Sequence, residues 1–290
     1  MNGIKVSESQ REKSEIMETE KLRNKITGTI ANLKRYSSHG SAVVDAVESL
    51  RRLDEILVDP TDENLIKIHH YMRGIRVGVD QLREYAPSIE EVLDEIGRWA
   101  EERFMERTHT VSGRLEMAPL EAEGFILDIG GGGEGIIGRL NGGQVVSIDL
   151  SAGELEETDN ESLKIVMDAT DLKFTPSQFD AATSFFTLLY VDREKYERVF
   201  REVHRVLKEE GRFLIWDVEI PEKVEGKHFF LVRLEISLPG EKVNTGYGVR
   251  LVRQDRGFFR ELAARTGFEV ADEWSEGEIF YLELRKTRAP

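Results

Sequence analysis

The chain has 290 residues, no cysteine and a formal net charge of -15 at pH 7. The lack of cysteine excludes disulfides, cysteine-ligated metals and cysteine nucleophiles. The acidity disfavours nucleic acid as a partner, because an acidic surface repels phosphate backbones. A hydrophobic fraction of 40% supports a folded core. No apolar stretch approaches the ~20 residues that a membrane helix needs, so we expect a soluble cytoplasmic protein with no membrane partner.

The first 120 residues have the apolar spacing of amphipathic helices. Apolar side chains recur every three or four positions over residues 14–36, 42–58, 63–85 and 88–108. We therefore expect a helical domain over residues 1–120, which a polar link over residues 108–123 joins to the rest. Its apolar stripes need a covering surface, so the domain is expected to act as a lid over a pocket or to form a homodimer.

Beyond Gly124 the pattern changes to short apolar strands that alternate with helices. Strands are expected at residues 125–129, 144–148, 163–167, 179–185 and 212–216, and helices at residues 134–140 and 193–208, the second ending at Gly211. A hairpin at 229–238 and 243–252, a helix at 257–266 and strands at 268–274 and 279–285 follow. This order predicts an α/β domain over residues 121–290, with a mostly parallel sheet, helices on both faces and an inserted hairpin.

A glycine run follows the first of these strands. Gly130, Gly132 and Gly135 fit G-x-G-x-x-G, a spacing that lets the backbone approach a nucleotide closely. On its own the motif leaves an NAD-dependent oxidoreductase open. Asp128 favours S-adenosylmethionine (SAM) instead, because a carboxylate repels a pyrophosphate but attracts the ammonium group of a methionine moiety.

Two further acids come at the ends of the next two strands. Asp149 can accept hydrogen bonds from both ribose hydroxyls, and Asp168 can accept one from an adenine amino group. The carboxyl ends of neighbouring strands are where ligands bind in open α/β sheets. The three acids therefore predict an adenosyl site.

Five motifs in this order resemble those of the class I SAM-dependent methyltransferases, over about residues 124–217. They are Asp128–Gly132, Ile148–Leu150, Met167–Ala169, Phe179–Asp180 and Arg205–Arg212. The resemblance implies a Rossmann-like sheet of seven strands with one antiparallel strand, SAM as cofactor, and methyl transfer as the activity.

The resemblance also implies roles for particular residues. It assigns Asp128, Gly130, Gly131 and Gly132 to the methionine part, Asp149 to the ribose, Leu150, Asp168 and Ala169 to the adenine, and Ser184 or Phe185 to the border of the transferable methyl group. Glu134 is a departure, since the family more often has a small or hydroxyl residue there.

The methyl acceptor is less well defined by the sequence. Alignment of the reactants supplies much of the rate acceleration, so a general base is optional. Residues 184–187 replace the Asn/Asp-Pro-Pro-Tyr motif that accompanies methylation of amide and exocyclic amino nitrogens, which favours a small-molecule substrate. The candidate substrate residues are Thr187, Tyr190, Trp216 and Tyr247. Asp217 is the candidate catalytic acid or base, although a core role for Trp216 and a turn-capping role for Asp217 compete.

Other functions stay open from the sequence alone. The chain fits a methyltransferase that acts on protein or RNA, with the helical domain as docking surface, and it also fits a non-catalytic SAM-binding protein. No metal site is predicted, because the adjacent His69 and His70 would point about 100° apart on a helix.

Overall fold

The computed structural model describes residues 8–58 and 60–287. The chain divides into two compact units, Met1–Arg107 and Thr108–Pro290. The expected polar link is wrong over its first part, because strand β1 (Thr108–Glu116) occupies it and belongs to the second unit. The sequence pattern does not indicate this strand, because Gly113 interrupts the alternation of apolar residues between the buried Val111 and Leu115.

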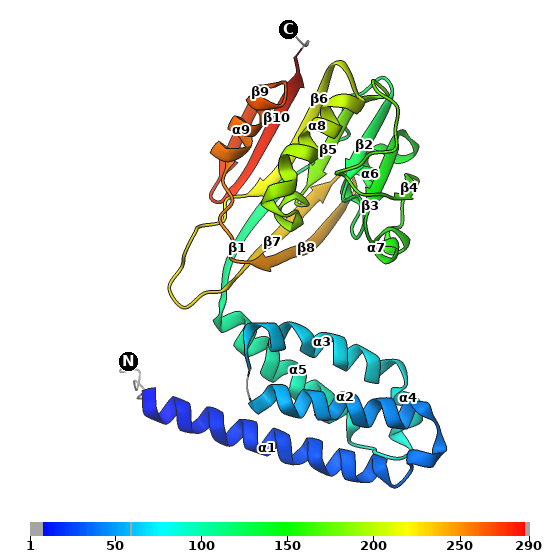
Figure 1. The fold of residues 1–290 in the computed structure, drawn as a ribbon, viewed down its shortest axis with the longest axis vertical. Coiled ribbons are helices and arrows are strands. Elements are labelled where there is room, and N and C mark those ends of the chain that lie inside the picture. Colours follow the sequence, from blue (N-terminus) through cyan, green and yellow to red (C-terminus); the bar gives the residue numbers. More distant parts are fainter. Residues whose placement is uncertain (1–7, 59, 288–290) are drawn as a thin grey trace. The chain divides into compact units, whose positions relative to one another are not determined.

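The first unit is helical, as the sequence predicts. Helix α1 packs against α2 and α5, and α3 also packs against α2 and α5, so four long helices lie side by side around one core (Figure 1). The expected helix over residues 63–85 is broken by Gly78, a weak helix former. The elements are α1 (Glu8–Lys34), α2 (Ser41–Val58), α3 (Asp62–Val77), α4 (Val79–Arg83) and α5 (Ile89–Glu106), with a 3-10 turn η1 (Ser37–His39).

The second unit is built on a seven-stranded sheet of order β4-β3-β2-β5-β6-β10-β9. Strand β10 is antiparallel to both of its neighbours, and the other pairs are parallel. This confirms the mostly parallel α/β sheet. The strands are β2 (Phe125–Ile129), β3 (Val145–Asp149), β4 (Leu163–Val166), β5 (Phe179–Phe185), β6 (Leu207–Val218), β9 (Phe268–Glu276) and β10 (Ile279–Lys286).

The hairpin does not stand alone but belongs to a second sheet. Strands β7 (Phe229–Leu238) and β8 (Glu241–Arg250) pair antiparallel, and β1 pairs parallel with β7. The order of this small sheet is β1-β7-β8. The hairpin is therefore held by β1, which lies before the glycine run in the sequence.

The two faces of the large sheet are covered differently (Figure 1). Helices α8 (Tyr196–Val206) and α9 (Arg256–Arg265) pack on one face, with Phe200 and Phe259 fully buried. The other face packs against α6 (Ile136–Asn141) and the small sheet, through residues such as Val232 and Ile236. Helices therefore lie on both faces, as expected, but on the second face the small sheet joins α6 in covering the large sheet.

The remaining elements are short. Helix α7 (Ala152–Glu157) packs beside β3 and β4, and the 3-10 turns are η2 (Gly142–Gln144), η3 (Leu188–Tyr190) and η4 (Arg193–Lys195). The expected helix end at Gly211 is also wrong, because α8 stops at Val206 and Leu207 already pairs with Phe179 of β5. Within residues 8–58 and 60–287, no helix has both the length and the apolarity to cross a membrane.

Candidate functional site

A cavity of about 740 Å³ opens at the carboxyl ends of the central parallel strands. Its size falls in the range of small-molecule sites. The wall comes from the glycine loop, from the segments that follow β3, β4 and β5, and from Gly246 and Tyr247 of β8. Every predicted cofactor residue except Ser184 lines it, namely Asp128, Gly130, Gly131, Gly132, Asp149, Leu150, Asp168, Ala169 and Phe185.

Ser184 lies behind this wall. Its side chain is fully buried in β5, and the hydroxyl oxygen has no hydrogen-bond partner. The structure brings its neighbour Phe185 to the cavity instead. Of the two residues expected to border the methyl group, Phe185 is therefore the one that lines the cavity.

The glycine loop turns tightly around the end of β3. The backbone N–H groups of Gly130 and Gly131 both donate to the carbonyl of Ile148, at 2.8 and 3.1 Å. A Cβ atom at Gly132 would lie 2.6 Å from the Cβ of Glu154 and 3.0 Å from Oδ2 of Asp149. The loop thus passes too close to these residues to carry a side chain, and it leaves its backbone open to a ligand.

Asp128 is buried at the base of the loop. Its carboxylate accepts a 2.7 Å hydrogen bond from the hydroxyl of Thr183 on β5. Burial raises the pKa of Asp128 to about 7, the hydrogen bond opposes this rise, and the charge of Asp149 adds to it. A cationic group in the cavity would stabilise the ionised carboxylate, so Asp128 is suited to the ammonium group of a methionine moiety.

Asp149 ends β3, and one of its oxygens caps the following turn. Oδ1 accepts from the backbone N–H of Ser151 at 2.8 Å. The next segment lies alongside, because the N–H of Met167 donates to the carbonyl of Asp149 at 2.9 Å. Asp149 and the segment that carries Asp168 therefore meet at one edge of the sheet, as predicted.

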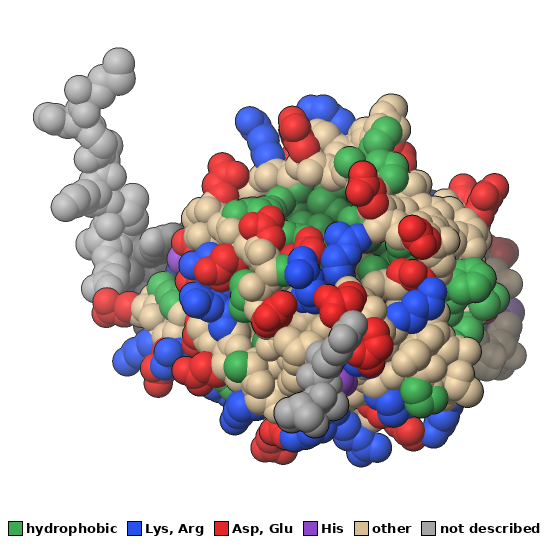
Figure 2. Space-filling view, turned by 90° about the horizontal axis from the view of Figure 1, so that it is seen from above, with side chains coloured by type: hydrophobic (Ala, Val, Ile, Leu, Met, Phe, Trp, Pro, Cys, Tyr) green, Lys and Arg blue, Asp and Glu red, His purple; other side chains and the backbone are tan. Residues whose placement is uncertain are grey.

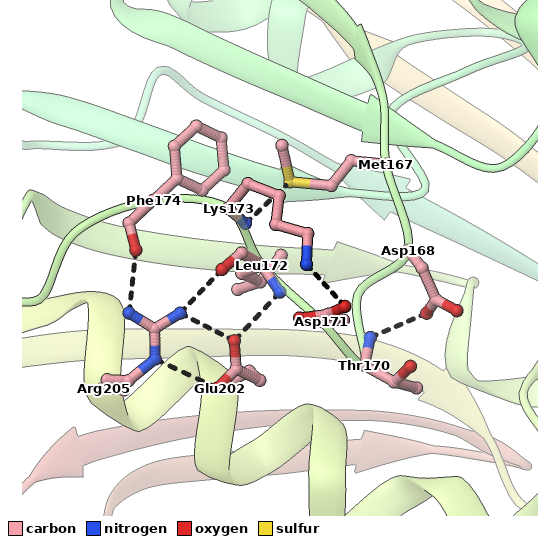
Figure 3. A network of polar contacts seen from close by, with 9 residues as sticks. All are labelled: Met167, Asp168, Thr170, Asp171, Leu172, Lys173, Phe174, Glu202 and Arg205. Atoms are coloured by element: carbon pink, nitrogen blue, oxygen red, sulfur yellow. Dashed lines mark hydrogen bonds and ion pairs between the residues drawn. The ribbon is translucent and has the colours of Figure 1, made fainter.

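The segment that carries Asp168 is fixed by its own hydrogen bonds and by α8 (Figure 3). The carboxylate of Asp168 accepts from the N–H of Thr170 at 2.8 Å, and this bond chiefly lowers the pKa of Asp168. Arg205 of α8 donates to the carbonyls of Phe174 and Leu172, at 2.7 and 2.8 Å. Asp168 is thus ionised and held in place, in the state that an adenine amino group requires.

Aromatic side chains line the part of the cavity beside β8. The rings of Tyr247 and Phe186 are stacked, with centroids 5.3 Å apart and an interplanar angle of 6°. The ring of Phe185 meets Tyr247 edge-on at 6.5 Å. Tyr190 and Thr187 also line the cavity. Three of the four predicted substrate residues, Thr187, Tyr190 and Tyr247, are therefore at the site.

Trp216 and Asp217 are not at the site, and the reason is the length of β6. The sequence predicts that this strand ends at residue 216, but β6 runs to Val218. It pairs Trp216 with Tyr281 and Asp217 with Phe280 of β10. Trp216 belongs to the core below the small sheet. Neither side chain lines the cavity, so a direct contact of Trp216 with substrate is not supported.

Asp217 is fully buried and acts within the protein. Its Oδ1 accepts from the N–H of Val218 and from Nε2 of Gln254, both at 2.8 Å. Burial raises the pKa of Asp217 to about 7, and hydrogen bonds that include the backbone of Leu188 and Leu189 lower it. The expected acid or base role is not supported by this position, and the hydrogen bonds of Asp217 instead tie the end of β6 to Gln254.

One residue of the cavity wall, Glu134, is not among the site residues predicted from the sequence. Glu134 lines the cavity and accepts hydrogen bonds from the hydroxyls of Tyr247, at 3.2 Å, and of Thr245. The only signal in the sequence was its departure from the family pattern. Among the residues that the structure describes, no group of three His, Cys, Asp or Glu residues could hold a metal ion. The side chains of His69 and His70 lie outside the described residues.

Comparison with known proteins agrees with this geometry. Residues 127–215 match the family model described as a methyltransferase domain. An uncharacterized protein of Methanocaldococcus jannaschii is 27% identical over 146 residues, which are 50% of this chain and 54% of that protein. The chain thus spans about half the length of this curated relative.

Solved structures of SAM-dependent methyltransferases are also similar. One from Methanosarcina mazei has a TM-score of 0.44 and 19% identity, covering 60% of this chain and 100% of its own. One from Mesorhizobium loti has a TM-score of 0.42 and 17% identity, covering 58% and 94%. By sequence, residues 127–215 thus match a methyltransferase domain. The motifs of the second unit resemble those of the class I SAM-dependent methyltransferases, whose cofactor is SAM.

Proposed function

We propose that the chain transfers a methyl group from SAM to a small-molecule acceptor. The observation that carries this proposal is the single cavity that joins three acids, Asp128, Asp149 and Asp168, around a glycine loop to an aromatic wall on β8. SAM would supply an electrophilic methyl group on a sulfonium. The residues of the chain would hold both reactants and exclude water, which accounts for much of the acceleration in such reactions.

Each side chain in the wall has a task that suits its chemistry. Asp128 would hold the ammonium group and Asp149 the ribose hydroxyls, because ionised carboxylates only accept hydrogen bonds. Asp168 would accept from the adenine amino group, with Leu150 and Ala169 against the ring. Phe185 would border the methyl group, and the acceptor would lie toward Thr187, Tyr190 and Tyr247.

A small acceptor is favoured over a macromolecule by the wall and by the charge. The small sheet contributes Gly246 and Tyr247 to the wall of the cavity. The net charge is -15, and acidic and basic side chains are interspersed over the face drawn in Figure 2. That face offers no continuous basic track for a phosphate backbone. The role of the helical unit and a cytoplasmic location stay predictions.

Calorimetric titration with SAM, S-adenosylhomocysteine (SAH) and NAD tests the cofactor site. We expect both adenosyl ligands to bind and NAD not to bind. Asp149→Ala should weaken the adenosyl ligands by about 10-fold or more, because it removes hydrogen bonds to an ionised acceptor. Asp159→Ala, an exposed residue away from the cavity, is the matched control and should bind normally.

Methyl transfer itself is tested with SAM that carries a labelled methyl group. Incorporation of label into small molecules of a cell extract supports the proposal. Incorporation into protein or RNA alone would replace the small-molecule acceptor by a macromolecular one. Tight SAM binding without incorporation into any fraction would favour a non-catalytic SAM-binding protein.

A further inference from the structure

The wall of the cavity is strongly acidic. Lys195 is its one cationic side chain among the lining residues, and its Nζ is 2.6 Å from Oδ2 of Asp192. Seven carboxylates line the same space: Asp128, Glu134, Asp149, Glu154, Glu157, Asp168 and Asp192. Three of these acids are accounted for by the cofactor. Of the other four, Asp192 is paired with Lys195 and Glu154 lies beside Gly132, whereas Glu134 contacts β8. The excess of carboxylates gives the cavity a negative potential, which attracts cations and repels anions.

Glu134 is the carboxylate that lies against the aromatic wall. Both hydrogen bonds to it come from neutral hydroxyls on β8, those of Tyr247 and Thr245. Burial and then the charge of Glu134 raise the pKa of Tyr247, so this hydroxyl keeps its proton and donates it. A carboxylate has about four lone-pair positions, so Glu134 retains the capacity to accept from a ligand.

The one cation near Glu134 in sequence does not neutralise its carboxylate. Arg139 donates through Nε to the backbone carbonyl of Glu134 at 2.7 Å. Its Nη1 lies 3.3 Å from a carboxylate oxygen of Glu241 on β8. The negative charge of Glu134 is therefore held in a fixed place by the loop and β8, without a protein cation bound to it among the ion pairs of the described residues.

The surrounding rings favour the same kind of ligand. Tyr247, Phe186 and Phe185 form one aromatic cluster, and all three line the cavity together with Tyr190. The face of an aromatic ring attracts a cation within about 6 Å of its centre. A fixed carboxylate beside several rings is an arrangement that binds organic cations and leaves anions unbound.

We propose that the methyl acceptor is a small organic molecule with a cationic nitrogen group, and that Glu134 binds this group against the ring of Tyr247, which Phe186 backs from the protein interior. Glu134 is then a specificity-determining residue of the acceptor site. The proposal rests on the function proposed above, since it concerns the acceptor side of the same cavity. The proposal states which group of the acceptor Glu134 recognises, and it does not specify which atom receives the methyl group.

Three phenyl probes that differ in their terminal group, which is cationic, neutral or anionic, test the proposal. They are 2-phenylethylamine, 2-phenylethanol and phenylacetate, titrated into the full chain saturated with SAH and followed by ligand-observed NMR. We expect the amine to bind about 10-fold or more tightly than the alcohol, as a charge-assisted hydrogen bond predicts, and the carboxylate to bind most weakly. Equal binding of the three probes, or binding of none by the SAH-saturated protein, would overturn the proposal.

Two variants then distinguish recognition of the cationic group by Glu134 from a purely structural role in which Glu134 holds the glycine loop against β8. Glu134→Gln should bring the amine to the level of the alcohol while SAH affinity is unchanged. Tyr247→Phe removes a hydrogen bond to Glu134 but keeps the ring and the charge, so the preference for the amine should survive. If both variants lost the preference for the amine equally, Glu134 would have only a structural role, which is to hold the loop against β8.

Glu156→Gln is the matched control for overall charge. Glu156 belongs to the same α7 helix as two of the lining acids, but it is exposed and outside the cavity wall. It should retain the preference for the amine, and an equal loss there would assign the effect to net charge alone. Failure of SAH to bind the unmodified chain would instead refute the proposed function, so the two failures are distinguishable.

Discussion

The hydroxyl of Thr183 donates a 2.7 Å hydrogen bond to the carboxylate of Asp128, across the register that pairs β5 with β2. Both side chains are buried. Burial raises the pKa of Asp128 to about 7, even though this hydrogen bond favours the ionised form. A carboxyl group at the base of the glycine loop is therefore about half protonated at neutral pH in the ligand-free protein.

SAM affinity should consequently depend on pH near neutrality. The ammonium group of SAM favours the ionised Asp128, and below pH 7 the proton must first be displaced. We expect the binding constant to rise about 10-fold between pH 6 and pH 8, in proportion to the ionised fraction of one group. Calorimetry at pH 6, 7 and 8 measures this slope.

Two variants assign the slope to one group. Asp128→Asn should bind SAM more weakly and with little dependence on pH. Asp217→Asn is the matched control, because the pKa of Asp217 is also raised to about 7 but its side chain is outside the cavity wall. If Asp128→Asn kept the full slope, Asp128 would not be the group that titrates on binding.

The same shift predicts how the stability of the ligand-free protein changes with pH. The folded form binds the Asp128 proton up to about pH 7, whereas the unfolded chain loses it near the ordinary value of 3.8. The free energy of unfolding should therefore fall as pH rises from about 4 to 7, by about 1.4 kcal/mol per pH unit for one such group. Asp217 contributes a similar slope, since its pKa is also raised to about 7. Asp128→Asn should therefore reduce the slope by the share of one group in urea unfolding at pH 5 and pH 8, and an unchanged slope would contradict the assignment.

Gly132 should tolerate no side chain. A Cβ atom there would lie 2.6 Å from Glu154 Cβ and 3.1 Å from its backbone, so Gly132→Ala should displace the loop and abolish measurable SAM binding. Gly153→Ala on α7 is the control, since its nearest neighbour is 3.8 Å away. It should bind SAM normally, with stability unchanged or raised by about 0.4–1 kcal/mol. Normal binding by Gly132→Ala would show that the ligand does not approach this part of the loop.

Local patterns in the sequence predicted those parts of the site that depend on strand ends. The bounds of β2 and β5 agree with the prediction. Asp128, Asp149 and Asp168 meet at one cavity because the carboxyl ends of parallel strands share one edge of a sheet.

The parts that were missed depend on pairing between distant segments. Strand β6 extends past Trp216 because β10 pairs with it to Val218, and this removes Asp217 from the cavity. Strand β1 forms by pairing with β7, and its own alternation is interrupted at Gly113. The role of Glu134 depends on Tyr247 of β8, a partner that no local pattern indicates.

Arg205 should link the stability of α8 to cofactor affinity. Its guanidinium joins Glu202, at 2.7 Å, to the carbonyls of Leu172 and Phe174, and Glu202 in turn accepts from the N–H of Leu172 at 2.9 Å. These bonds hold the segment after Asp168 against the helix (Figure 3). Arg205→Met keeps much of the aliphatic length but removes every donor, so we expect a loss of about 2 kcal/mol in the free energy of unfolding.

A loosened segment would hold Asp168 less firmly, and SAM affinity should fall by about 3–10-fold, as ordering a flexible loop costs free energy on binding. Arg201→Ala is the matched control on the same helix, because within residues 8–58 and 60–287 its side-chain bonds go to the exposed Glu197. Its unfolding free energy should change by about 0.5 kcal/mol or less, with SAM affinity unchanged. Urea unfolding and calorimetry on both variants measure the two effects. An Arg205→Met protein that is destabilised but binds SAM normally would show that Asp168 keeps its position without the anchor, through its own turn with Thr170 alone.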